Sequence, residues 1–119
     1  MIKGIGCDLV TVSRIEQLLC SPRFRRKVYT PYEQEIVTGC PACTAAGIWA
    51  AKEAVSKAFG TGFAGFQLRD IEVRRDEKGK PYVCLYGRAL EFFDGINGET
   101  IHLSISHEKD TAMAFAIIE

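Results

Sequence analysis

The stretch IWAAKEAVSKAFG, residues Ile48–Gly60, decides the fold that we predict for this chain. It is rich in Ala, Lys and Glu and contains no Pro, so its helix propensity is high. At about 100° per residue, small apolar residues gather on one side of the helix and polar residues on the other. The apolar side suits close packing against a sheet or another helix. It consists of Gly47, Ala51, Ala54, Val55 and Ala58, whereas Trp49, Lys52, Glu53, Ser56 and Lys57 lie on the other side.

The second side of this helix combines a carboxylate with two amines. Glu53 and Lys57 stand four residues apart, in the order that favours an ion pair on a helix. Two interpretations stay open from the helix alone. The charges belong either to a solvated helix face with a weak surface ion pair or to a site that binds a charged ligand.

Length and composition limit the function classes. A chain of 119 residues suits one domain with a real core and is too short for two. With 47% hydrophobic and 25% charged residues, it is ordinary for a soluble globular protein. The formal net charge of zero provides no overall attraction to nucleic acid or anionic membranes, although residues 23–27, RFRRK, concentrate four basic side chains. We therefore expect neither nucleic acid nor a membrane as a partner.

Targeting signals and disulfides are not expected. No apolar run approaches the roughly 20 residues of a membrane span. Asp8 interrupts the N-terminal apolar segment too early for a signal peptide. Five cysteines, an odd number, are scattered along the chain, which argues against a disulfide framework. These features predict a cytoplasmic protein.

Local patterns predict a single α+β domain over residues 1–119, in which a mostly antiparallel sheet packs on the long central helix. Ser13 is expected to cap the first helix. The motif Thr30–Glu33, TPYE, has the pattern of a capping box with proline at the first helical position. The other expected elements are a strand over 2–12, helices over 13–20 and 31–39, a short basic helix or turn over 24–28, a strand hairpin over 68–75 and 81–86, a short helix over 88–95, and strands over 100–106 and 112–118.

Two finer expectations concern the second half of the chain. Alternation in the first hairpin strand predicts that Ile71 and Val73 point inward and Glu72 outward. Leu90 and Phe93 are expected to be the buried residues of the short helix.

A glycine loop, GTGFAG, follows the long helix at residues 60–65. It is either a helix C-cap with a turn or a loop that approaches a phosphate closely. It is not a phosphate-binding P-loop, because no Gly-Lys-Ser/Thr follows.

Two carboxylates on different predicted elements could bind a cation. Asp8 interrupts an otherwise apolar strand, so it must be paired, bind a cation or lie at the open end of the strand. A helix cap or turn is the alternative. Asp8 and Glu53 together suit Mg²⁺, which usually takes one or two protein carboxylates together with water and substrate phosphates. Lys57 would then provide a point charge for those phosphates.

A rival cluster consists of Cys40 and Cys43 with His102 and His107. These residues could bind zinc, or the two cysteines could form a redox pair. No second Cys-x-x-Cys exists, and the βαβ setting of a thioredoxin-like motif is not predicted here. A serine nucleophile elbow of the type G-x-S-x-G is also absent from the sequence.

Four sequence blocks, in order along nearly the whole chain, resemble one family. They are Gly4–Asp8 followed by Arg14, Thr30–Glu33, Trp49–Ala54 with Ser56–Ala58 and Gly60, and Ser104–His107 before an apolar C-terminal strand. In these blocks the chain resembles the holo-(acyl carrier protein) synthases, the short single-domain class of the 4′-phosphopantetheinyl transferases. The resemblance implies transfer of phosphopantetheine from coenzyme A to a serine of apo-acyl carrier protein.

The resemblance also implies roles for individual residues. Asp8 and Glu53 correspond to the Mg²⁺ ligands, and Lys57 to a lysine that contacts the phosphates of coenzyme A. Glu53 is in addition one candidate for the general base. The remaining matches are Ser106 and His107, which correspond to the segment lining the coenzyme A site, and Arg14, which with the basic stretch after it corresponds to the surface that docks the carrier protein.

Members of the short class form homotrimers with active sites between subunits, so the resemblance implies a homotrimer here. A non-catalytic module that binds carrier protein or nucleotide is the alternative function. Intact Asp8, Glu53 and Lys57 argue against that alternative. The sequence leaves open which carrier protein and which pathway are served.

Overall fold

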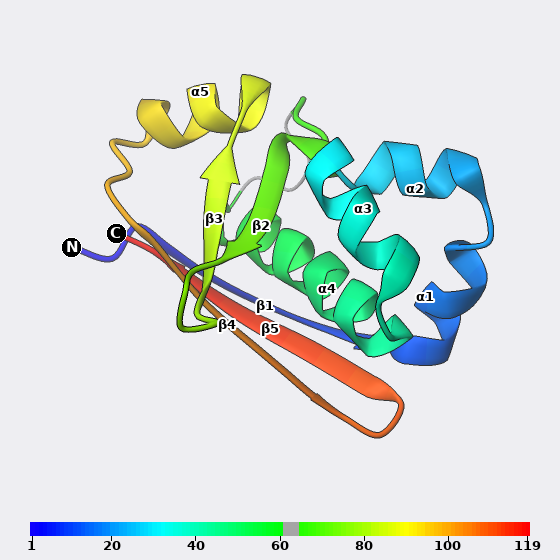
Figure 1. Cartoon of the computed structure of the whole chain (residues 1–119). Helices are drawn as coiled ribbons and strands as arrows, with labels where there is room; N and C mark the ends of the chain where they lie inside the picture. The colour runs from blue at the N-terminus through cyan, green and yellow to red at the C-terminus, as the bar shows by residue number, and fades with distance from the viewer. Residues whose placement is uncertain (61–64) are drawn as a thin grey trace.

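A computed structural model describes residues 1–60 and 65–119 of the chain (Figure 1). The predicted glycine loop therefore lies mostly outside the described residues. Gly60 itself is described: its φ of +81° ends the long helix, as expected for a C-cap glycine. In chain order the elements are β1 (Gly4–Thr11), α1 (Val12–Leu18), α2 (Pro22–Val28), α3 (Pro31–Gly39), α4 (Ala42–Ala58), the 3₁₀ turn η1 (Leu68–Asp70), β2 (Ile71–Arg75), β3 (Pro81–Leu85), α5 (Gly87–Gly95), β4 (Ile101–Glu108) and β5 (Thr111–Ile118).

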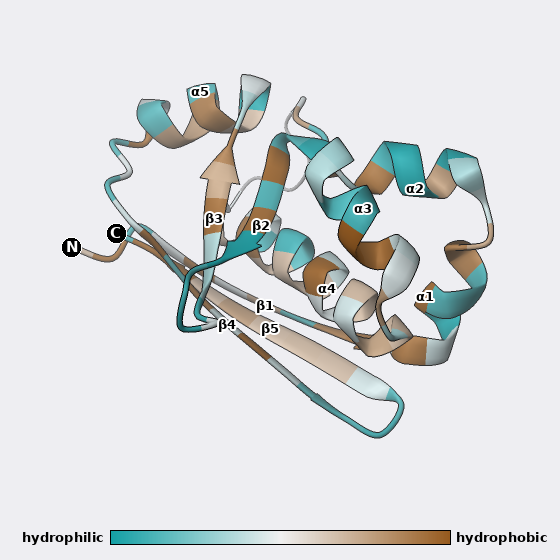
Figure 2. Ribbon diagram, in the orientation of Figure 1, coloured by the Kyte–Doolittle hydropathy of each residue, from teal (hydrophilic) through white to brown (hydrophobic). Residues whose placement is uncertain are grey.

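The strands form two antiparallel sheets around α4. One sheet has the strand order β1-β5-β4, and the other is the hairpin β2-β3. α4 lies between the three-stranded sheet on one side and β2 with α3 on the other (Figure 1). Figure 2 shows apolar residues along β5 and mostly hydrophilic residues along α2. The predicted α+β class and the central position of the long helix are thereby confirmed. None of the described helices is long and apolar enough to cross a membrane.

Small residues let α4 pack unusually close to β1. A Cβ atom built on Gly4 would lie 1.8 Å from the Ala58 carbonyl oxygen, and one built on Gly6 would lie 2.0 Å from that of Ala54. On β5, the residues facing α4 are the fully buried Ala112, Ala114 and Ala116. The backbone of α4 therefore lies almost directly on the sheet, and its carboxylate and amine side chains come within reach of β1.

The helical wheel was wrong for part of the second side of α4. Lys52 and Ser56 were assigned to that side, yet Lys52 is fully buried and Ser56 is 2% exposed. The cause is the β2–α3 layer, which covers this side and which a wheel cannot reveal. Lys52 forms a buried ion pair with Glu33, while Ser56 donates a hydrogen bond to the Lys52 carbonyl oxygen at 2.9 Å.

Two other burial expectations were wrong. Glu72 was expected to point outward but is 4% exposed, because it accepts hydrogen bonds from Arg74 Nε at 2.7 Å and from Tyr86 Oη at 3.1 Å. Leu90 was expected to be buried but is 41% exposed. The short helix α5 turns Ala89 into the core instead, and Phe93 is half-buried.

Helix starts were predicted with mixed success. The capping box is confirmed: Thr30 Oγ1 accepts from the Glu33 backbone N–H at 3.2 Å, and Glu33 Oε1 accepts from the Thr30 N–H at 2.9 Å. Ser13 does not cap α1, which already begins at Val12. Ser13 instead donates its N–H and hydroxyl to the Asp110 carboxylate at 2.9 and 2.8 Å. This tertiary contact joins α1 to the β4–β5 turn.

Candidate functional site

Asp8, Glu53 and Lys57 come together where β1 crosses α4. Asp8 follows Gly4 and Gly6 on the face of β1 that packs on the helix, because side chains alternate along a strand. Lys57 Nζ donates to Asp8 Oδ1 and to the Cys7 carbonyl oxygen, at 3.0 Å each. The ion pair expected between Glu53 and Lys57 is thus replaced, within the described chain, by one between Asp8 and Lys57.

The electrostatics of this site reflect two neighbouring carboxylates. The pKa of Glu53 is raised, first by burial and then by the negative charge of Asp8, while Lys57 opposes the shift. The pKa of the Lys57 ammonium is also raised, chiefly by its hydrogen bond to Asp8. Asp8 Oδ2 is buried and has no hydrogen-bond partner in the described part of the chain. The cluster therefore holds more negative charge and more acceptor capacity than Lys57 satisfies.

These residues fit a hard divalent cation. A buried carboxylate oxygen without a hydrogen-bond partner lowers the stability of the folded protein. A cation bound to Asp8 Oδ2 would provide the missing partner and offset the repulsion between Asp8 and Glu53. Mg²⁺ needs only one or two protein carboxylates. Among residues 1–60 and 65–119, no group of three or more His, Cys, Asp or Glu side chains could hold a metal ion. Asp8, with its unpartnered Oδ2, and the neighbouring Glu53 are the residues that would hold such a cation.

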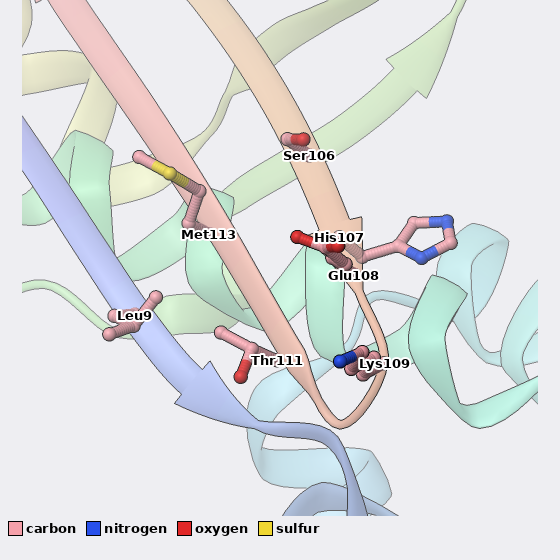
Figure 3. A pocket seen from close by; sticks show the side chains of 7 residues that line it. All are labelled: Leu9, Ser106, His107, Glu108, Lys109, Thr111 and Met113. Carbon is pink, nitrogen blue, oxygen red and sulfur yellow. The ribbon is translucent and has the colours of Figure 1, made fainter.

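Ser106 and His107 lie elsewhere in the protomer. They line an open cavity of about 410 Å³ at the β4–β5 turn, together with Leu9 and Met113 (Figure 3). Ser106 pairs in register with Met113, and Met113 with Leu9, across the outer face of the sheet. The His107 ring points away from Leu9 and Met113 in Figure 3. Ser106 therefore lies on the sheet face opposite to Asp8, whereas His107, paired with the buried Ala112, shares the α4-facing side with Asp8 but lies two strands away. Among the described residues, no hydrogen bond or ion pair joins either of them to Asp8.

A second opening adjoins Lys57. This cavity of about 310 Å³ is lined by Ile5, Gly6, Cys7, Lys57 and Phe115 at the β1 edge of the sheet. The side chain of Lys57 is 56% exposed, whereas that of Asp8 is 12% exposed. A ligand in this opening would meet the side chain of Lys57, whose ammonium group is paired with the less exposed Asp8.

Comparison with known proteins places the chain in a family. Residues 4–116 match the model of the 4′-phosphopantetheinyl transferase superfamily. The holo-[acyl-carrier-protein] synthase of Alkaliphilus metalliredigens is 45% identical over 98% of this chain and 98% of its own length. The chain belongs to the holo-[acyl-carrier-protein] synthase family.

Solved structures of this family share the fold. The holo-[acyl-carrier-protein] synthase of Neisseria meningitidis superposes with a TM-score of 0.90 at 38% identity, covering 100% of this chain and 99% of that one. The enzyme of Helicobacter pylori, solved in complex with coenzyme A, superposes with a TM-score of 0.82 at 30% identity, covering 97% and 99%. The resemblance read from the sequence blocks is confirmed.

The basic surface expected of a family member lies on α1 and α2. Arg14 is exposed on α1, and Arg23 and Arg26 are exposed on α2. Arg25 differs from them, because it is half-buried and donates to the Leu19 carbonyl oxygen at the end of α1. It satisfies a helix terminus and is not one of the freely exposed charges.

The rival cluster of cysteines and histidines does not assemble. Cys40 and Cys43 lie half-buried at the α3–α4 junction, and burial raises the pKa of the Cys40 thiol. His102 pairs with Glu119 instead, with its Nε2 2.6 Å from Oε1. His107 lies at the far end of β4. In the part of the chain that the structure describes, these four residues therefore form no zinc site.

Replacing both Cys40 and Cys43 with serine is therefore expected to leave transfer activity within about twofold of wild type. The Cys40 thiol, whose pKa is raised by burial, reacts poorly, and neither cysteine is near Asp8. Steady-state rates and metal analysis of the purified double variant test this expectation. Stoichiometric zinc in the wild-type protein that disappears in the variant would contradict it.

Proposed function

We infer that this chain is a holo-[acyl-carrier-protein] synthase. It transfers the 4′-phosphopantetheine group from coenzyme A to a serine hydroxyl of apo-acyl carrier protein and releases adenosine 3′,5′-bisphosphate. The observation that supports this most is the cluster of Asp8, Glu53 and Lys57, with its unpartnered carboxylate oxygen and exposed ammonium. Full-length relatives that carry this name support the same conclusion.

The reaction must bring two anionic partners together and stabilise charge on the departing bisphosphate. When bound to Asp8 and Glu53, Mg²⁺ supplies positive charge to the diphosphate of coenzyme A. Lys57 adds a second positive charge from the entrance of the site. Its flexible ammonium is tethered to Asp8 and to the Cys7 carbonyl oxygen, so it needs only a small movement to contact a phosphate.

Glu53 is one candidate for the general base that accepts the proton of the serine hydroxyl. It lies next to Asp8 on the rigid helix α4, which suits a group that must hold a fixed position. The protein itself contributes no nucleophile in this mechanism, since the attacking hydroxyl belongs to the carrier protein.

Mass spectrometry provides the direct test of function. Apo-acyl carrier proteins are incubated with the purified enzyme, coenzyme A and Mg²⁺, and the carrier is expected to gain the mass of one phosphopantetheine group. A panel of carriers from different pathways identifies the preferred substrate. Binding of carrier and coenzyme A without any mass gain would favour the non-catalytic module instead.

We also propose that the protein is a homotrimer in the cytoplasm, with active sites between subunits. The outer face of the sheet supports this arrangement, because Leu9, Ile5, Met113 and Phe115 are 69%, 61%, 41% and 39% exposed. Apolar patches of this kind mark interaction surfaces. A second subunit would also allow Ser106 and His107 of one chain to complete the Asp8 site of another.

The proposed location in the cytoplasm rests on the cysteines. All five are free thiols, which suits a reducing compartment.

Sedimentation equilibrium at micromolar concentration is expected to give three times the chain mass of 13.2 kDa. Leu9→Glu should shift the protein toward monomer, because a charge on this apolar face opposes association. Lys78→Glu, in the β2–β3 turn, is the control that should remain trimeric. Wild-type protein that sediments at the mass of one chain would reject the trimer.

The carrier protein is proposed to dock on the basic surface formed by Arg14, Arg23 and Arg26. Acyl carrier proteins are strongly acidic, whereas this chain has no net charge, so local charge must steer the encounter. Steering between exposed charges is screened over about 8 Å at physiological salt. Arg14→Glu is expected to raise KM for carrier protein several-fold and to flatten its salt dependence.

The same Arg14→Glu variant should bind coenzyme A with a nearly unchanged dissociation constant, measured by calorimetry. Lys78→Glu introduces the same charge change in the β2–β3 turn and should leave both quantities unchanged. If Arg14→Glu instead weakens coenzyme A binding and spares KM for carrier protein, Arg14 belongs to the nucleotide site and the docking surface is wrong.

A further inference from the structure

A buried ion pair involves Lys52, the residue that directly precedes Glu53 on α4. Lys52 and Glu33 both have fully buried side chains, and Nζ lies 2.5 Å from Oε1. The ammonium group also donates to the carbonyl oxygens of Leu68, at 3.1 Å, and Ile71, at 2.6 Å. An ammonium group has three donors. All three are therefore used, each in a fixed direction.

Glu33 links this lysine to two further elements. Its Oε1 also accepts from the Thr30 N–H at the start of α3, and its Oε2 accepts from the Val73 N–H of β2 at 2.7 Å. The pair thus joins α3, α4 and the segment η1–β2 through directional bonds. Buried ion pairs are weak sources of stability compared with apolar side chains, and their best-documented role is to select one arrangement. This pair has no part in the mechanism above.

The opposite side of α4 provides little directional control. On β1 and β5, most of the residues that face α4 are glycine or alanine, with Val10 and Ile118 as larger exceptions. The small residues set the distance between helix and sheet. Small, smooth side chains resist rotation or sliding of a helix only weakly, because few of them interlock. Hydrogen bonds depend on both distance and angle. The rotation of α4 about its axis is therefore controlled mainly from the Lys52 side.

That rotation determines where the reactive side chains point. Glu53 follows Lys52 directly, about 100° further around the helix, and Lys57 lies about 140° from Lys52 by the same geometry. Both must face Asp8 on β1. A small rotation or shift of α4 would move Glu53 and Lys57 together relative to Asp8.

We propose that Lys52 and Glu33 are positioning residues that fix the rotation and height of α4 and thereby hold Glu53 and Lys57 at Asp8. The proposal rests on the proposed function, since it concerns the site that would bind Mg²⁺. Both side chains are fully buried, so each acts through the neighbouring residues of α4. Sequence patterns missed this role because Lys52 lies on the polar side of the wheel and Glu33 is explained by its capping box alone.

The test compares Lys52→Met and Glu33→Gln with Val55→Ala. Val55 is a fully buried apolar residue of α4, so its truncation destabilises the same helix without touching the ion pair. All variants are studied at a temperature where circular dichroism shows them folded. Mn²⁺ binding in the presence of coenzyme A, followed by electron paramagnetic resonance, is expected to weaken about tenfold or more in the first two variants and less than about twofold in Val55→Ala.

Steady-state kinetics give a second readout. A positioning role predicts that kcat falls in Lys52→Met and Glu33→Gln while KM for carrier protein, which docks on α1 and α2, stays unchanged. If both variants match Val55→Ala in Mn²⁺ affinity and kcat, the pair is merely structural and the proposal is overturned. If Lys52→Met fails to fold, Glu33→Asp replaces it in the comparison with Val55→Ala. This change keeps the negative charge but shortens the side chain by one methylene group.

Asp8→Asn separates failure of this proposal from failure of the proposed function. If folded Asp8→Asn binds Mn²⁺ as wild type does, the metal site itself is wrong. If Asp8→Asn loses Mn²⁺ binding while Lys52→Met and Glu33→Gln bind as Val55→Ala does, the metal site stands and only the positioning role fails.

Discussion

Asp8→Asn and Glu53→Gln are each expected to lower the transfer rate by roughly a hundredfold or more, the scale seen when one preorganised electrostatic group is removed. Each change replaces a carboxylate with an amide of nearly the same shape. The amide cannot provide the negative charge that a divalent cation needs. Asp8 Oδ2 has no hydrogen-bond partner among the described residues, so no neighbouring group compensates for the lost cation. Rates measured over a range of Mg²⁺ concentrations test the expectation.

The same two variants should melt close to the wild-type temperature. In the wild-type protein, Lys57 Nζ donates to Asp8 Oδ1 at 3.0 Å. In Asp8→Asn, Lys57 can still donate to the amide oxygen at the same position. An ion pair with one exposed partner contributes little to stability. Asp94→Asn, an exposed position on α5, is the matched control and should keep full activity. Near wild-type turnover of either site variant at limiting Mg²⁺ would contradict the role assigned to the two carboxylates.

Gly6→Ala is expected to destabilise the fold strongly. The new Cβ atom would lie 2.0 Å from the Ala54 carbonyl oxygen and 2.7 Å from the Ala58 nitrogen. Both are backbone atoms of α4, so no flexible side chain can move aside. Either β1 or α4 must shift, which we expect to cost about 3 kcal/mol or more, at or above the usual range for an overpacked core.

Urea unfolding measures this loss as a lower midpoint with an unchanged slope. Gly39→Ala is the control, because a Cβ atom at Gly39 meets nothing within 4 Å. Since Gly6 precedes Asp8 by two residues on the same strand face, the folded fraction of Gly6→Ala should also lose activity. A Gly6→Ala protein with wild-type stability would show that α4 does not pack on β1 as closely as described.

Much of the site was predictable because its signals are local in sequence. Glycine at residues 4 and 6, followed by Asp8, indicates a strand that another element approaches closely and that is interrupted by a charged group. The amphipathic pattern of α4 placed Glu53 and Lys57 on one side. The Thr30–Glu33 capping box predicted the start of α3 correctly because a cap depends on residues within one turn.

The predictions failed where a second packed layer decided the outcome. The wheel treated α4 as a helix with one buried side, but α3 and β2 cover the side that carries Lys52 and Ser56. Glu72 follows the alternation expected for an outward residue, yet Arg74 and Tyr86 shield it. Such burial depends on contacts between residues far apart in the chain, which no local period records.

By itself the sequence determined the α+β class, the order of the helices and strands, and the residue types available for chemistry, because propensity, periodicity and capping act over a few neighbouring residues. Only the tertiary structure decided which of these residues meet. It paired Lys57 with Asp8 instead of Glu53, buried Lys52 against Glu33, and put Ser106 on the opposite sheet face from Asp8. The physical reason is that strand register and helix packing, set by the whole core, determine the direction of every side chain.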